Sequence, residues 1–157
     1  METLTAAPLC HCTTLVVETD QPHAFVDLTD RVSRLLLESG IHAGTVTIQS
    51  CHTTTGVVIN EHEPLLLVDF HRLLDRLAPR GSVYHHDDMT RRTGISDHEP
   101  QNGHAHCRAL LLPSSVTLVV HEGRLALGRW QRLFLVEFDG PRTREVAVAV
   151  VGRGAGR

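Results

Sequence analysis

Histidine is the residue type whose number and placement in this chain could do chemistry. The sequence holds 12 histidines, against one Trp and one Tyr. Neutral imidazole is a common ligand for zinc and related divalent ions, and an open catalytic zinc site typically uses three protein ligands and a water. Five candidates fall in three stretches of the chain: His52, His85, His86, His104 and His106. Their spacing matches no regular metal motif, so a metal site and ordinary histidines both remain open from the residues alone.

The other histidines are interpreted as ordinary surface or core residues: His11, His23, His42, His62, His71, His98 and His121. Two carboxylates are candidates for orienting a ligand histidine or for acting as a general base on a metal-bound water, namely Glu61 and Asp69. A solvated helix face explains Asp69 equally well.

Hydroxyl and guanidinium groups near these candidates could bind a substrate. Thr53 and Thr54 supply hydroxyls directly after His52. Arg124 and Arg129 are planar donors suited to phosphate, as is Arg108, although most arginines are simply surface residues. The four cysteines include no Cys-x-x-Cys pair, and they are expected to be small, buried thiols.

The elements that would position these groups follow from the apolar pattern. Alternation and β-branched residues predict strands over 10–19, 44–51, 55–60, 116–120, 133–138 and 145–151. Three- and four-residue spacing predicts helices over 23–38, 64–77 and 104–112, the first ending at Gly40. Between them, residues 83–103 form a long polar loop, which is usually functional in a compact domain. The order predicts an α+β fold, with largely antiparallel β-sheets packed with two to three helices.

Length and composition favour one domain over residues 1–157, with an ordered core over about 10–151 and a mobile tail over 152–157. The net charge is -3 and no basic run is present, which argues against a nucleic-acid partner. The N-terminus lacks a signal-peptide pattern and the apolar stretches are too short to span a bilayer. We therefore expect a cytoplasmic protein with no membrane association.

Several ordered motifs resemble the YjbQ family, often described as secondary thiamine-phosphate synthases. The motifs are Cys51-His52-Thr53-Thr54, Asn60-Glu61, Tyr84-His85-His86-Asp87, Asn102-Gly103-His104-Ala105-His106, the run from Gly123 to Gln131, and the run from Glu137 to Arg142. They span about residues 10–151. The stretch ending in Trp130-Gln131 is the most specific of them.

The resemblance implies a small trimeric α+β protein with a divalent metal, zinc by ligand type. It implies His52, His86 and His106 as the metal ligands, and it gives His85 and His104 second-choice status. Arg129 stands where the family usually has Thr, so specificity could differ if that position touches substrate.

The family suggests a transferase that joins a pyrimidine pyrophosphate to a thiazole phosphate. On this hypothesis Glu61, Asp69 and Arg124 are the candidate catalytic residues, and the candidate substrate-binding residues are Thr53, Thr54, Arg129, Trp130 and Gln131. Three imidazoles suit zinc better than magnesium, so a zinc-dependent hydrolase of a small metabolite is an alternative. A non-catalytic trimer that binds a metal or small ligand is a third possibility.

Overall fold

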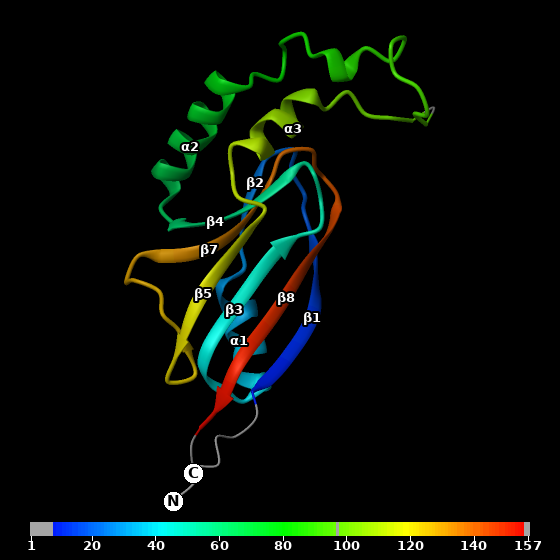
Figure 1. The fold of residues 1–157 in the computed structure, drawn as a ribbon. Helices are drawn as coiled ribbons and strands as arrows, with labels where there is room; N and C mark the ends of the chain where they lie inside the picture. The colour runs from blue at the N-terminus through cyan, green and yellow to red at the C-terminus, as the bar shows by residue number, and fades with distance from the viewer. Residues whose placement is uncertain (1–7, 97, 156–157) are drawn as a thin grey trace, which may run out of the picture.

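The computed structural model describes residues 8–96 and 98–155, which fold into two antiparallel sheets and three α-helices (Figure 1). The strands are β1 (Leu9–Glu18), β2 (Ala24–Asp27), β3 (Ile41–Ser50), β4 (Thr55–Glu61), β5 (Ser115–His121), β6 (Arg124–Leu125), β7 (Gln131–Glu137) and β8 (Thr143–Gly154). The helices are α1 (Thr29–Ser39), α2 (Pro64–Leu77), α3 (Gly103–Leu110) and the short 3₁₀ helix η1 (His85–Asp87). The predicted α+β class with antiparallel sheets is confirmed.

The larger sheet has the strand order β1-β8-β3-β5-β6, and the smaller has the order β2-β7-β4. All recorded strand pairs are antiparallel, and β8 is central to the larger sheet because it pairs with both β1 and β3. Inward-facing side chains alternate along each of these strands, as β8 shows with Val146, Val148 and Val150, which are at most 2% exposed.

Strand β7 is buried on both faces and separates two apolar clusters. Leu133 and Leu135 face the first cluster, which fills the space between the two sheets and α1. Phe134 and Val136 face the second cluster, where α2 and α3 cover the other side of the small sheet. The molecule is therefore layered, with the large sheet, the small sheet, and then the helices α2 and α3.

The predicted helix over 23–38 is wrong at its start, because residues 24–27 form strand β2 and the helix begins at Thr29. The apolar spacing there also fits an edge strand, and pairing of β2 with β7 supplies backbone hydrogen bonds that a first helical turn lacks. The helix ends at Gly40 as predicted, with φ of 66°. Helix α2 matches the predicted 64–77 span.

The C-terminal strand extends past the end that the sequence predicted. Residues 152–154 continue β8, because they pair with the start of β3, for example Gly154 with Ile41. The expectation of buried cysteines is also wrong, since Cys10, Cys12, Cys51 and Cys107 are all exposed. Cys10 and Cys12 lie on the same face of β1, with their sulfur atoms 3.7 Å apart.

Candidate functional site

Two of the predicted ligands, His86 and His106, come together in the structure. His86 lies in η1 and His106 in α3, and the centroids of their rings are 4.6 Å apart in an edge-to-face arrangement. Both side chains are partly buried. The long polar loop therefore begins and ends at one place, and each end contributes one imidazole.

Two local contacts hold these ends together. The Asp87 carboxylate accepts a hydrogen bond from the backbone N–H of Gly103 at 2.8 Å, which satisfies one of the free N–H groups at the start of α3. Gly103 is needed because a Cβ there would lie 2.5 Å from Cβ of Tyr84. The sequence motifs on both sides of the loop thus fit one another directly.

Asn102 links the histidine pair to the end of β7. Its side chain is 6% exposed, and its Oδ1 lies 3.2 Å from Nε2 of His86. Its Nδ2 donates to Oδ2 of Asp139 at 2.8 Å. Asp139 also receives hydrogen bonds from the guanidinium of Arg142, whose Nη2 lies 2.9 Å from the same oxygen. The pair is therefore backed by a polar chain of three residues.

The pair fits the donor chemistry of a metal site. Burial, and then the neighbouring His86, lower the pKa of His106, so its imidazole stays neutral at neutral pH as a ligand must. Among the residues that the structure describes, neither Nδ1 of His86 nor either ring nitrogen of His106 has a hydrogen-bond partner. Lone pairs are thus available on both rings.

His52 does not join the pair within one chain. It follows β3, and its Nε2 accepts a hydrogen bond from the backbone N–H of Glu145 at 2.8 Å. Burial, and then the Arg144 charge, lower the pKa of His52. Across residues 8–96 and 98–155, no three His, Cys, Asp or Glu side chains gather in a way that could hold a metal. One chain thus supplies two neighbouring candidate ligands, and the third is used to fasten the β3–β4 loop to β8.

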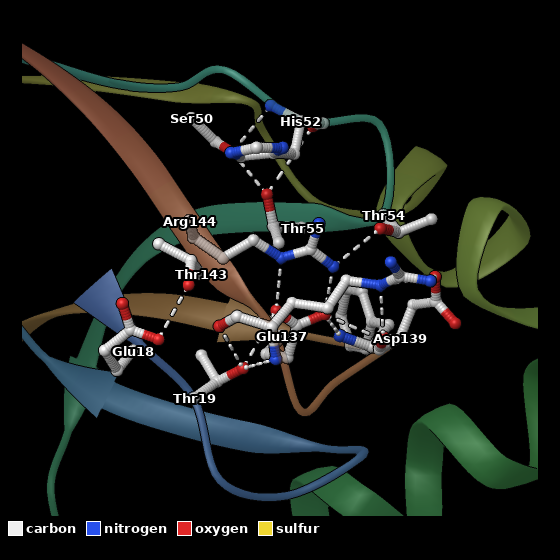
Figure 2. A network of polar contacts seen from close by, with 12 residues as sticks. Glu18, Thr19, Ser50, His52, Thr54, Thr55, Glu137, Asp139, Thr143 and Arg144 are labelled. Atoms are coloured by element: carbon white, nitrogen blue, oxygen red, sulfur yellow. Dashed lines mark hydrogen bonds and ion pairs between the residues drawn. The ribbon is translucent and has the colours of Figure 1, made fainter. Parts of the chain in front are cut away.

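A buried ion pair lies below His52 (Figure 2). Glu137 at the end of β7 is fully buried, and its carboxylate is held by Arg144 of β8, with Nε and Nη2 at 2.5 and 2.6 Å. The same carboxylate accepts the backbone N–H groups of Phe138 and Asp139, the latter at 2.7 Å. Glu137 therefore fixes the backbone from which Asp139 reaches Asn102.

The two predicted substrate hydroxyls differ in their surroundings. Thr54 is 4% exposed, and its Oγ1 accepts a hydrogen bond from Nη2 of Arg144 at 3.0 Å. Thr53 is exposed. Thr54 thus belongs to the buried network, while Thr53 remains accessible beside His52.

The candidate catalytic carboxylates lie elsewhere in the chain. Glu61 ends β4, opposite Gln131 on β7. Asp69 is on the exposed side of α2, with its side chain 68% exposed and 3.7 Å from Nη1 of Arg72. In the part of the chain that the structure describes, no hydrogen bond or ion pair joins either carboxylate to the histidine pair.

The remaining catalytic candidate, Arg124, lies with two of the predicted substrate residues. Arg124, Arg129 and Gln131 line a cavity of about 510 Å³ between α1 and the β6–β7 connection. Trp130 is 62% exposed and is stacked under the guanidinium of Arg129, 4.8 Å from the ring centroid. In Figure 1 this connection lies on the left side of the molecule, away from the loop that carries η1 at the top.

His104 belongs to a second cluster of histidines around a buried cation. Arg108 is 1% exposed and donates to Oδ1 of Asp75 at 2.6 Å, and its Nη1 lies 2.8 Å from Nε2 of His23. The ring centroids of His71 and His104 are 6.2 and 6.1 Å from that of His23. A cation already fills this cluster, so it offers a poor environment for a metal ion.

Sequence reasoning gave no function to Asn102, Asp139, Glu137 or Arg144. The alternation along β8 did mark Arg144, because it falls on the same inward-facing side of the strand as Val146, Val148 and Val150. A charge at such a position needs a buried partner. Asn102 and Asp139 carry no comparable signal, because their contact depends on how the long loop folds back onto the end of β7.

The fold defines a class of small α+β proteins with two antiparallel sheets, for which solved structures exist. The chain superimposes on a YbjQ-like protein of unknown function from Sulfolobus solfataricus with a TM-score of 0.84 at 31% identity, covering 94% of this chain and all of the other. A YjbQ/UPF0047 protein from Clostridium acetobutylicum gives a TM-score of 0.78 at 33% identity, covering 88% and 98% of the two chains.

The sequence comparisons identify the family. The UPF0047 protein YjbQ-like family model matches residues 13–153. A UPF0047 protein from Archaeoglobus fulgidus is 42% identical over 134 residues, which is 85% of this chain and 96% of that protein. The UPF0047 protein YugU from Bacillus subtilis is 34% identical, covering 88% of this chain and 98% of YugU. The chain therefore belongs to the UPF0047/YjbQ family, as the motifs predicted.

Over the described residues, none of the helices has the length and apolar character needed to cross a membrane.

Proposed function

We propose that this chain binds a divalent metal, zinc by ligand chemistry, through His86 and His106, and that it acts on a small phosphorylated molecule. The supporting observation is the pair of facing, partly buried imidazoles with available lone pairs. Imidazole ligands favour zinc over magnesium, which prefers oxygen ligands. When bound, such a metal supplies a Lewis acid for a phosphate or activates a water.

On this proposal the third ligand comes from a neighbouring copy in a homotrimer. His52 lies apart from the pair within its own chain, where its Nε2 accepts the backbone N–H of Glu145, so on this proposal assembly replaces that hydrogen bond with the metal. In an assembled trimer, the β3–β4 loop of one copy can lie beside the η1 and α3 region of another. The proposal therefore puts His52 of one copy near the histidine pair of another.

Metal binding is tested by measuring the zinc affinity of the purified protein by competition with a chromophoric chelator. We expect His86→Ala and His106→Ala each to lower the affinity at least tenfold, since each removes a ligand. His85→Ala is the matched control, because it removes the neighbouring imidazole, which contacts Arg91 instead of the pair. Equal affinities for His85→Ala and His86→Ala would overturn the proposal.

The position of the third ligand is tested by mixing chains. Neither His52→Ala nor His86→Ala is expected to bind zinc tightly alone. If His52 comes from a neighbouring copy, trimers co-expressed from both variants should regain about a quarter of the tight sites, because random assembly pairs intact halves at that frequency. No recovery would place the third ligand elsewhere.

For the reaction itself, a thiamine-phosphate synthase type of transferase is the first candidate, favoured by the cavity that Arg124 and Arg129 line. A zinc-dependent hydrolase is the second, favoured by the imidazole ligands. A panel of phosphorylated metabolites, with and without a thiazole phosphate acceptor, separates the two. Turnover that persists in His106→Ala would show that the metal pair has no part in it, and zinc binding without turnover would leave a non-catalytic binding protein.

A further inference from the structure

The chain of contacts from Asp139 to His86 has a defined direction of hydrogen bonding. A carboxylate only accepts, so the atom of Asn102 that lies 2.8 Å from Oδ2 of Asp139 is its NH₂ group. The amide oxygen of Asn102 therefore faces Nε2 of His86, at 3.2 Å. An amide oxygen also only accepts, and so the hydrogen of this contact must come from His86.

We infer that Asn102 and Asp139 are positioning residues that hold His86 in its Nε2–H tautomer, leaving Nδ1 as the atom available to a ligand. The two ring nitrogens of histidine have opposite roles in the neutral form, and the partner of one decides what the other can do. Metal-ligating histidines commonly donate their second N–H to a carboxylate or a carbonyl. The inference rests on the proposed function for the identity of that ligand.

The placement of Asn102 supports a role beyond helix capping. Asn102 is the residue that precedes α3, where an Asn side chain usually accepts a backbone N–H of the first turn. Here its side chain makes no such bond, and Asp87 accepts the N–H of Gly103 instead. The amide is thereby released for the contact between Asp139 and His86, and it is buried there.

The other end of the chain of contacts is rigid. Asp139 is fixed through its backbone N–H by the buried carboxylate of Glu137, and its side chain receives the guanidinium of Arg142. A carboxylate oxygen held from both sides has little freedom to rotate away from Asn102. The amide orientation, and with it the tautomer of His86, is thus set by groups outside the loop.

The test is ¹⁵N NMR of the histidine rings in chelator-treated protein, which reports the tautomer without any metal. In the wild-type protein we expect a slowly exchanging Nε2–H signal from His86. Asn102→Ala should lose that signal, and Asp139→Ala should weaken it. Asn102→Asp keeps an acceptor oxygen but loses the donor to Asp139 and sets two carboxylates against each other, so it should weaken the signal as Asp139→Ala does. His85→Ala should leave it unchanged.

A proton on Nδ1 of His86 in the wild-type protein, or an unchanged Nε2–H signal in Asn102→Ala, would overturn the inference. Titration with zinc chloride then separates this inference from the proposed function. Zinc should shift Nδ1 while the Nε2–H persists, and Asn102→Ala should bind zinc 10 to 100 times more weakly. If the protein keeps the Nε2–H tautomer but binds no zinc, the positioning role stands and the proposed metal site is refuted. If zinc instead binds at Nε2, the metal site stands and the positioning role is refuted.

Discussion

At the scale of single residues, the contact of Arg108 with His23 depends on a neutral imidazole. Burial first, and then the Arg108 charge, lower the pKa of His23 from 6.5 to about 4. His104 and His71 oppose its protonation as well, and Asp75 favours it. Between these two pKa values His23 is protonated in the unfolded chain but neutral in the folded chain. The free energy of unfolding therefore falls as the pH drops from 6.5 towards 4.

We predict that His23→Gln flattens this part of the stability profile. Glutamine keeps an acceptor for Arg108 but does not titrate. After discounting for the partial exposure of the group, the loss of stability attributable to His23 is about 1 kcal/mol over this range. Urea unfolding at a series of pH values measures it, and an identical slope in both proteins would contradict the assignment. Other histidines with lowered pKa remain in both proteins, so only the difference between them counts.

Glu137 presents a second residue-scale prediction. Glu137→Gln removes the charge that compensates Arg144, which is itself only 5% exposed, and we expect a loss of about 3–5 kcal/mol in the free energy of unfolding. Arg142→Gln is the control, because Arg142 is exposed and its ion pair with Asp139 is worth under about 1 kcal/mol. Urea denaturation measures the loss of stability in each variant. Similar losses would show that the buried ion pair contributes no more to stability than the exposed one.

At the scale of elements, the packing of α3 against the start of η1 depends on a glycine. In Gly103→Ala the new Cβ would lie 2.5 Å from Cβ of Tyr84, so one of the two elements must shift. We expect a loss of about 1–3 kcal/mol and a larger separation of His86 from His106. Gly81→Ala is the matched control, because nothing lies within 4 Å of its added Cβ. Thermal unfolding and zinc affinity measure the two effects, and equal behaviour of both variants would rule out the close contact as their cause.

The elements also show what local sequence can and cannot predict. Helix α2 was predicted to the residue because Pro64 starts it, its apolar spacing is regular, and Pro79 follows its end. Strand β2 was missed because its four residues have no turn signal separating them from α1. Its existence depends on β7, more than 100 residues later in the chain, and no local pattern reports that pairing.

The same limit applied to the site. His86 and His106 could be singled out because the resemblance to the YjbQ family marked them as candidate ligands. No local pattern indicated that Nε2 of His52 accepts a hydrogen bond from the backbone of Glu145 within the same chain. That contact follows from the register of β3 against β8, which sets where the β3–β4 loop lies.

At the scale of the whole molecule, the outer face of the large sheet is not covered by any other element formed by residues 8–96 and 98–155. In Figure 1 strands β1, β8 and β3 lie in front, with α1 behind them. Adjacent strands align small, uncharged side chains across this face, in two rows: Cys12, Ala149, Thr47 and Thr117, and then Thr14, Ala147, Gln49 and Ser115. Such a surface suits close packing against another sheet, and it is where we expect the copies of a homotrimer to meet.

Ala149→Arg puts a charge at the centre of this face, where a partner's sheet would have to bury it without a counter-ion, at a cost of several kcal/mol. We therefore expect the wild-type protein to have three times the chain mass of 17.3 kDa by light scattering, and Ala149→Arg to have the mass of one chain. Leu37→Arg is the control, because Leu37 lies on α1 and is already 76% exposed, and this variant should stay trimeric. If the site lies between copies, Ala149→Arg should lose tight zinc binding together with the trimer, although it alters neither His86 nor His106. A monomeric Ala149→Arg that keeps full zinc affinity would instead place every ligand within one chain.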